Sequence, residues 1–191
     1  MNDPVVRLEQ WIADAGGFDS VDAVAMCLAT ADADGSPSAR IVLLRGLDAR
    51  GLQFFTSYLS RKGRELQENP RAAAVLYWAR LQRQVRIEGS VVELPEGESD
   101  AYFASRPRGH QISAWASEQS AILESYGVLE ERFTHFELRF EGEEVPRPHS
   151  WGGFLLQPSR IEFWEGRANR MHDRIAYARI GNTWSAVRLQ P

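Results

Sequence analysis

The sequence has very little cysteine and no long apolar segment. Cys27 is the one cysteine in 191 residues, so the chain cannot form an internal disulfide, which suits a reducing compartment. No apolar run approaches the roughly 20 residues that a membrane-spanning helix needs. The start, Met1-Asn2-Asp3-Pro4, lacks the basic and apolar regions of a secretory signal. We therefore expect a soluble, cytoplasmic protein.

Lysine is also almost absent. The chain has 22 Lys+Arg and 26 Asp+Glu, a formal net charge of −4, and Lys62 is its single lysine. A net negative charge argues against non-specific nucleic-acid binding, which needs a basic field. The arginine excess has two interpretations. One is a biased genome composition, and the other is a set of arginines that bind planar or phosphate oxyanions through their forked donors.

The order of elements predicts a single domain, residues 1–191, that is mainly β with helices. Six Trp, nine Phe and five Tyr require an interior and exclude a disordered chain. Strand-length apolar segments alternate with turn sequences up to residue 94, residues 96–140 have helical spacing, and strands return from Gly153 onward. Because no βαβ alternation occurs, we predict an antiparallel barrel with flanking helices, an α+β fold with a helical insertion at about 96–140.

The segment Ser60-Arg61-Lys62 places two cations at the start of a predicted helix. Cations in a first helical turn oppose the helix dipole, whereas the free backbone N–H groups there attract anions. A bound phosphate would explain this arrangement, and a solvated helix face explains it equally well.

A second cationic cluster is Arg170-Met171-His172-Asp173-Arg174. On a strand, Arg170, His172 and Arg174 would share one face, which suits an anionic substrate better than a core. An exposed strand edge with ordinary charges is the alternative. Trp164, just upstream, could stack on an aromatic ligand, although a lone tryptophan is more often part of a core.

A third cluster lies in the helical insertion. Tyr102 and Arg106 are four residues apart and therefore share a helix face, and Pro107 leaves open whether His110 continues it. The segment is either a loop over a cleft or a surface helix-turn-helix. Cys27, inside an apolar run, reads as a buried small hydrophobe.

Several common site motifs are missing. The sequence has no glycine-rich phosphate loop, no Cys/His metal spacing and no nucleophile elbow, so no metal site is expected. The residues alone thus predict a small barrel that can hold a phosphorylated aromatic ligand, and they do not specify a reaction.

Nearly the whole chain carries short motifs whose residues and order match those of a known family. They include Arg40 to Leu44, Ser60-Arg61-Lys62, Arg83-Gln84-Val85, Tyr102-Phe103, Ser105 to Arg108, Gln119-Ser120, Trp151-Gly152-Gly153, Ile161 to Trp164 and Arg170 to Arg174. In these motifs the sequence resembles the pyridoxamine 5′-phosphate oxidase family of FMN-dependent split-barrel enzymes. The resemblance implies an FMN-binding split β-barrel and a homodimer with two FMN sites at the subunit interface.

The resemblance also implies a role for each matching residue. FMN contacts would come from Arg40, Arg45, Thr56, Arg61, Lys62, Gln84, Gln119, Ser120, Trp164 and Arg174. Substrate contacts would come from Tyr102, Arg106, Arg170 and His172, with Arg170 and His172 as the catalytic pair. Arg45 and His110 are further substrate-binding candidates, although both differ from the residue usual in the family. The family reaction moves a hydride from the substrate to the flavin, and O2 then reoxidises the flavin to give H2O2.

Four features depart from the family pattern, and three of them lie on the substrate side. Arg45 stands where lysine is usual, and His110 replaces a serine that helps to hold the substrate phosphate. Phe55 replaces a tyrosine beside the flavin. The chain begins about where the family's shared body begins, so we expect no N-terminal tail over the substrate.

These departures leave three functions to consider. Oxidation of pyridoxamine or pyridoxine 5′-phosphate is favoured by the retained motifs. Oxidation of a dihydrophenazine carboxylate, as in the phenazine-biosynthesis oxidases of the family, would suit an altered phosphate site. A non-catalytic flavin-binding module is the third, and the retained Arg170 and His172 argue against it because a cofactor carrier does not need them.

Overall fold

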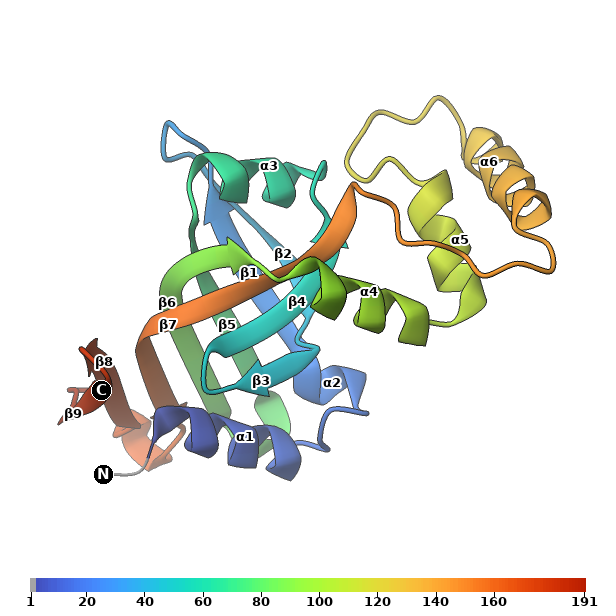
Figure 1. Ribbon diagram of the computed structural model, residues 1–191. Coiled ribbons are helices and arrows are strands. Elements are labelled where there is room, and N and C mark those ends of the chain that lie inside the picture. The colour runs from blue at the N-terminus through green and yellow to red at the C-terminus, as the bar shows by residue number, and fades with distance from the viewer. Residues whose placement is uncertain (1–2) are drawn as a thin grey trace.

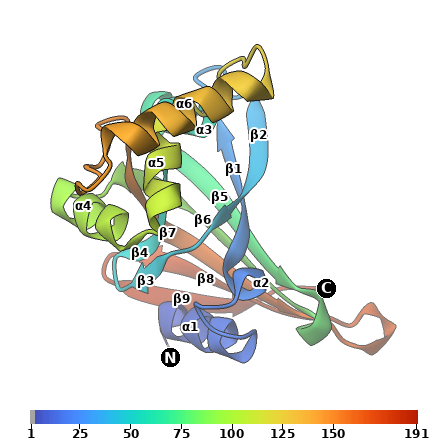
Figure 2. The same ribbon diagram turned by 90° about the vertical axis from the view of Figure 1, so that its right-hand side faces the viewer.

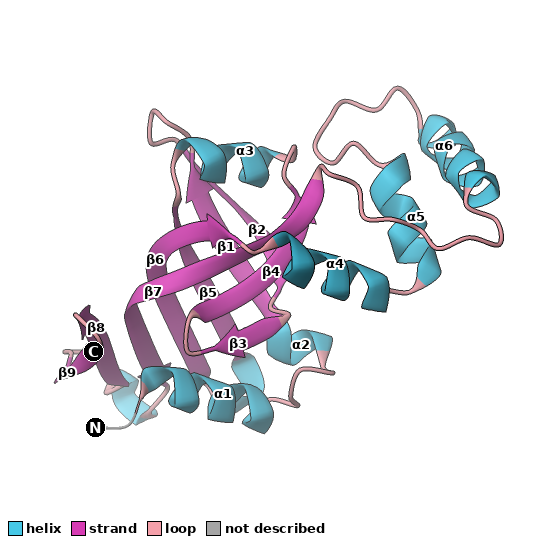
Figure 3. Cartoon of the chain, in the orientation of Figure 1, coloured by secondary structure: helices cyan, strands magenta, loops and turns pink. Residues whose placement is uncertain are grey.

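The computed structural model describes residues 3–191 and centres on a strongly curled antiparallel sheet (Figures 1 and 3). Met1 and Asn2, which begin the segment inspected for a secretory signal, lie outside the described residues. The main strand order is β2-β1-β5-β6-β7-β4-β3, and β8 pairs with both β7 and β9. The strands are β1 (Ala25–Ala31), β2 (Pro37–Leu43), β3 (Gly46–Asp48), β4 (Gly51–Ser57), β5 (Arg71–Trp78), β6 (Arg83–Glu93), β7 (Trp151–Glu165), β8 (Asp173–Ile180) and β9 (Thr183–Arg188).

Six α-helices surround the sheet in the described residues, and two short 3₁₀ turns occupy Ala79–Leu81 and Ala168–Arg170. The helices are α1 (Pro4–Asp14), α2 (Val21–Val24), α3 (Arg61–Glu68), α4 (Glu96–Ser105), α5 (Arg108–Ala116) and α6 (Tyr126–Arg139). Within residues 3–191, none of them is long and apolar enough to cross a membrane. In Figures 1 and 2, α3, α5 and α6 lie at one end of the barrel, whereas α1, β8 and β9 lie towards the other. The predicted mainly β architecture with flanking helices is confirmed.

The barrel core follows from alternation of side chains along the strands. In β1, Met26, Leu28 and Thr30 are buried, and the residues between them are partly exposed. Helix α1 begins at a cap formed by Asp3. It covers one end of this core, where Trp11 packs edge-on against Phe163 at 5.0 Å between ring centroids. A second, smaller cluster built on Phe103, Ile112, Phe140, Val145 and Trp151 holds α4–α6 against the start of β7.

Strand β7 joins the two ends of the molecule. It is one strand of 15 residues, and it pairs with β4, β6 and β8 along its length. The pairing with β6 shifts register between Glu88 and Gly89. At Gly89 an added Cβ would lie 2.0 Å from the Gln157 carbonyl oxygen, so only glycine permits this close approach.

Two element boundaries differ from the sequence-based expectation. The helical spacing expected over residues 96–140 is interrupted after α5, and α6 begins only at Tyr126, where the Ser125 hydroxyl caps it. The strand expected from Arg170 begins only at Asp173.

Candidate functional site

A cavity of about 690 Å³ opens where β2, β4, α3, α4 and α5 meet. Cationic and polar side chains that the sequence analysis assigned to cofactor or substrate line it together. They are Arg40, Arg45, Thr56, Lys62, Tyr102, Arg106, His110 and Gln119. Side chains from distant parts of the sequence thus share one cavity, and four of them are arginine or lysine cations, namely Arg40, Arg45, Lys62 and Arg106.

Lys62 is buried at the edge of this cavity. Its Nζ donates to Thr56 Oγ1 at 3.1 Å, to Ser60 Oγ at 3.1 Å and to Gln119 Oε1 at 2.9 Å. All three acceptors are neutral, so these hydrogen bonds leave the ammonium charge uncompensated. Burial, together with the nearby positive charge of Arg40, lowers the pKa of Lys62 to about 8 in spite of the opposing effect of Glu65.

Helix α3 is positioned by its first turn. The Ser60 hydroxyl accepts the Gly63 N–H at 3.2 Å and caps the helix. Gly63 allows the helix to lie against the preceding backbone, because an added Cβ there would be 2.2 Å from the Tyr58 carbonyl oxygen. The helix N-terminus therefore adds free backbone N–H groups next to Lys62, which favours an anion at this point.

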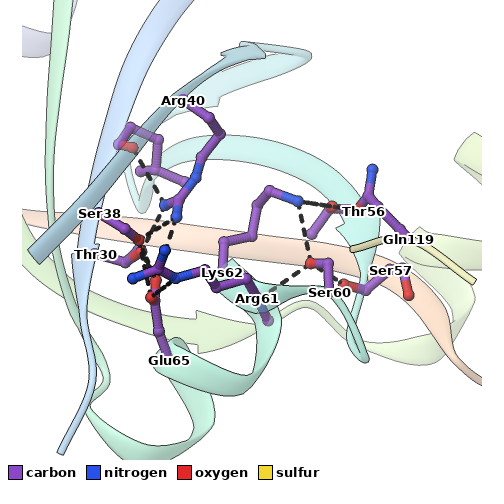
Figure 4. A network of polar contacts seen from close by, with 12 residues as sticks. Thr30, Ser38, Arg40, Thr56, Ser57, Ser60, Arg61, Lys62, Glu65 and Gln119 are labelled. Carbon is purple, nitrogen blue, oxygen red and sulfur yellow. Dashed lines mark hydrogen bonds and ion pairs between the residues drawn. The ribbon is translucent and has the colours of Figure 1, made fainter. Parts of the chain in front are cut away.

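Behind the cavity, a buried carboxylate on α3 organises two arginines (Figure 4). Glu65 accepts hydrogen bonds from the hydroxyl groups of Thr30 and Ser38, and it pairs with Arg40 at 3.2 Å and with Arg61 at 2.8 Å. Burial alone would raise the pKa of Glu65, but these hydroxyl and guanidinium groups outweigh it and hold the pKa at about 2. Glu65 is thus ionised at every physiological pH.

Aromatic rings and Arg106 form another wall of the cavity. Phe55 stacks on Tyr102 at 3.8 Å between ring centroids and on Trp151 at 5.8 Å. Arg106 lies with its Cζ 4.6 Å from the Trp151 ring centroid, and its buried Nη1 has no hydrogen-bond partner among the described residues. Burial lowers the pKa of Arg106, with the positive charge of Arg45 acting in the same direction. A buried guanidinium nitrogen without a partner is costly unless an anionic ligand completes it.

A second group of assigned residues lies on β6, β7 and β8. Gln84, Trp164 and Arg174 are direct neighbours across these three strands. The His172 ring is 4.6 Å from the Trp164 ring, and the Arg167 backbone N–H donates to His172 Nδ1 at 3.2 Å. Arg174 is held in turn by the buried Glu162, whose Oε1 accepts from its Nη2 at 2.7 Å and from its Nε at 2.9 Å.

The expectation that Arg170, His172 and Arg174 share a strand face is wrong. Arg170 ends a 3₁₀ turn and His172 lies in the short link before β8, so only Arg174 belongs to the strand. Asn169 and Arg170 have positive φ angles of 56° and 60°, a conformation that is unfavourable for residues other than glycine. Alternation fails here because the chain turns back on itself before β8 begins.

The two groups lie at opposite ends of β7 (Figure 1). Trp151, at the start of the strand, lines the cavity, whereas Trp164, near its end, belongs to the second group. No member of the second group lines the cavity. Arg61 and Ser120 flank the cavity without lining it: Arg61 is largely exposed beside Glu65, and Ser120 follows Gln119 in an exposed loop. One copy of the chain therefore does not bring all the assigned residues together.

Sequence reasoning missed the carboxylates that orient the site. Glu65 could have been found, because it lies four residues after Arg61 on the same helix, a spacing that favours an ion pair. Glu162 gives no such signal, since its contact with Arg174 depends on the pairing of β7 with β8.

Sequence comparison connects this architecture to a known family. Residues 21–140 match the family described as pyridoxamine 5′-phosphate oxidase, and residues 151–191 match the pyridoxine 5′-phosphate oxidase C-terminal dimerisation region. The chain is 54% identical over 189 residues to the pyridoxine/pyridoxamine 5′-phosphate oxidase of Rubrobacter xylanophilus, covering 99% of this chain and 87% of that protein. It is 52% identical to the same enzyme of Thermosynechococcus vestitus, covering 99% and 89%.

Solved structures give the same result. PhzG from Burkholderia lata 383, solved in complex with tetrahydrophenazine-1-carboxylic acid, superposes with a TM-score of 0.94 at 35% identity, covering 100% of this chain and 94% of that one. An FMN-binding protein from Nostoc punctiforme shares the fold, with a TM-score of 0.72 at 18% identity over 98% of this chain and 94% of that one. The expected split-barrel fold is confirmed, and the dimerisation region indicates a homodimer. With both regions matched and relatives more than half identical over nearly its full length, the chain belongs to the pyridoxamine 5′-phosphate oxidase family.

Proposed function

We propose that this chain is an FMN-dependent oxidase of pyridoxamine or pyridoxine 5′-phosphate, with O2 as electron acceptor and H2O2 as product. Family membership and the relatives of the same name support the reaction. The observation that carries the proposal is the convergence of Arg40, Arg45, Lys62 and Arg106 on one cavity with aromatic walls. A flat ligand with a phosphate group needs both features.

The donor set of the cavity fits the phosphate of FMN. Lys62 is a buried ammonium with only neutral acceptors, the α3 N-terminus lies beside it, and Arg40 is held in place by Glu65. We assign the cofactor phosphate to this cradle, with Arg45, Thr56, Arg61, Gln119 and Ser120 around it. When bound, FMN supplies the redox chemistry by which electrons leave the substrate and reach O2.

The remaining cofactor contacts come from a second copy of the chain. Gln84, Trp164 and Arg174 form one patch across three strands, far along β7 from the cavity. In a homodimer, the patch of one subunit faces the cavity of the other, so each of two sites uses both chains. This arrangement explains why assigned residues lie at both ends of one protomer.

Substrate binding uses groups beside the cofactor cradle, and Arg45 is assigned to both ligands. The unpartnered Nη1 of Arg106, together with Arg45 and His110, suits the substrate phosphate, and Tyr102 lies on the same wall. Arg170 and His172 approach from the other subunit. Because Nδ1 of His172 accepts the Arg167 N–H, the neutral ring carries its proton on Nε2 and can donate a hydrogen bond to the substrate.

Oxidation of a dihydrophenazine carboxylate is the second candidate. It is favoured by the close superposition of PhzG, whose structure holds tetrahydrophenazine-1-carboxylic acid. A carboxylate could bind Arg45 or Arg106 in place of a phosphate. The retained arginines do not separate the two substrates, because both are flat anions.

The test is steady-state turnover by FMN-loaded protein. We expect pyridoxamine 5′-phosphate to be oxidised with one H2O2 formed per substrate, and a reduced phenazine carboxylate to be oxidised slowly by comparison. Turnover of the phenazine alone would show that the phosphate site has been rebuilt for a carboxylated ring. Flavin binding with no turnover of either would identify a non-catalytic flavin-binding module.

Two further assignments complete the proposal. We assign residues 1–191 to one domain, because Ser99 of α4 accepts the Gly153 N–H of β7 at 3.1 Å and so ties the helical segment to the barrel. A cytoplasmic location fits the single cysteine.

A further inference from the structure

The carboxylate of Glu65 is fully engaged although it does not line the cavity. Its residue is 4% exposed, and both carboxylate oxygens are used. Oε1 accepts from Ser38 at 2.8 Å and from Arg61 at 2.8 Å, and Oε2 accepts from Thr30 and from Arg40 at 3.2 Å. A buried charge with this many partners is costly to assemble for stability alone, since apolar residues can fill the same space.

We propose that Glu65 is a positioning residue that makes the cavity selective for a flavin bearing a phosphate, by fixing Arg40 in the cavity wall and Arg61 beside it. The inference rests on the proposed function, because it assumes that the cradle receives the phosphate of FMN. Glu65 itself touches neither cofactor nor substrate, and it acts through the two arginines that it pairs.

The charge of the cradle supports this role. Arg40, Arg61 and Lys62, the cations that interact with Glu65, carry three positive charges, and Glu65 carries one negative charge. Arg45 adds a further positive charge to the cavity lining. A phosphate monoester carries roughly two negative charges near neutral pH. Glu65 therefore limits the repulsion among the three cations, while the cradle keeps a net positive charge that favours a phosphate dianion.

The geometry gives a second reason. Arginine side chains have many rotamers, and ordering one on binding costs free energy. Arg40 is fixed before the ligand arrives, because its Nη1 donates to the Leu28 carbonyl and to Thr30, and its Nη2 donates to Ser38 and Glu65. Its Nε and its positive charge are left for a ligand in the cavity that it lines. Arg61 is fixed at one point by Glu65, while most of its side chain stays exposed. Pre-ordering both donors moves this cost from binding to folding.

Two possible roles of Glu65, repulsion of the anion and positioning of the arginines, make opposite predictions for Glu65→Gln. If the carboxylate were only a negative charge near an anion site, its removal would strengthen FMN binding. If it positions the arginines, its removal releases them and FMN binding weakens. We expect the second outcome, with a Kd for FMN about tenfold higher, as for loss of one charge-assisted contact.

The experiment is a titration of cofactor-free protein with FMN and, separately, with riboflavin, followed by quenching of flavin fluorescence. Riboflavin lacks the phosphate, so its Kd should stay within about twofold of wild type in Glu65→Gln. Glu68→Gln is the matched control, because Glu68 is an exposed carboxylate on the same helix and its loss changes the net charge equally. We expect this control to leave both Kd values unchanged.

Three outcomes would overturn the inference: an unchanged or tighter FMN Kd in Glu65→Gln, an equal loss for both flavins, or the same FMN loss in Glu68→Gln. Should Glu65→Gln fail to fold, Ser38→Ala gives the same test in milder form. It removes a hydroxyl that contacts both Glu65 and Arg40, so it should weaken FMN binding and spare riboflavin. Wild-type protein that binds FMN no better than riboflavin would instead contradict the proposed cofactor cradle.

Discussion

The stability contribution of Glu65 should appear as a pH-dependent difference between wild type and Glu65→Gln. The hydroxyl and guanidinium partners hold the pKa of Glu65 at about 2 against the effect of burial, compared with 4.5 for a free glutamate. A carboxylate whose pKa is depressed by folding contributes stability that is complete above its unfolded pKa and is lost as pH falls through its folded pKa. The difference between 4.5 and about 2 corresponds to about 3 kcal/mol.

Urea unfolding at one fixed protein concentration measures this contribution, because the stability of a dimer depends on concentration. Near pH 7 wild type should be more stable than Glu65→Gln, and between pH 7 and pH 3.5 the difference in unfolding free energy should shrink by about 1.4 kcal/mol. Other carboxylates titrate in both proteins and cancel in the comparison. Parallel pH profiles for the two proteins would refute the assignment of a strongly depressed pKa to Glu65.

Three other predictions concern the site and its support. The pKa of Lys62 is about 8, so its ammonium loses its charge as pH rises from 7.5 to 9.5 and the affinity of wild type for FMN should fall. The affinity should change less in Lys62→Arg, whose guanidinium stays charged. An equal change of FMN Kd with pH in the two proteins, measured by fluorescence titration, would contradict this. His172→Ala should lower oxidase turnover at least about tenfold while flavin stays bound, as loss of a group that contacts the substrate does, and unchanged turnover would remove His172 from the site. Gly63→Ala should lower the unfolding free energy by more than about 2 kcal/mol, because the added Cβ would lie 2.2 Å from the Tyr58 carbonyl oxygen. Gly97→Ala is the control, since open space surrounds Gly97, and thermal denaturation of both variants measures the difference.

Much of the architecture was accessible from the sequence because local patterns decide it. An apolar segment of strand length predicts β1, and the Ser60 cap marks the start of α3. Arg61 and Lys62 were identified as candidates from the sequence, because cations at a helix N-terminus oppose the helix dipole and a bound anion would explain them. The family resemblance then placed the remaining residues, which composition and spacing could not connect.

Other features depend on contacts between distant segments. The link before β8 turns back through two residues with positive φ angles, Asn169 and Arg170, and neither is a glycine that would announce such a turn. The pairing of Glu162 with Arg174 depends on the register between β7 and β8, and the sequence pattern alone does not specify that register. The placement of the two groups of residues at opposite ends of β7 likewise appears only when the strand is seen as continuous.

The central claim, an oxidase whose site is shared between two copies of the chain, can be tested by mixing two inactive variants. Arg106→Ala damages the cavity side and His172→Ala damages the opposite side, so a mixed dimer of the two holds one site with both changes and one site with neither. At equal amounts, random pairing should restore about one quarter of wild-type pyridoxamine 5′-phosphate oxidation. Activity of the mixture no higher than that of the separate variants would contradict a site built from two subunits.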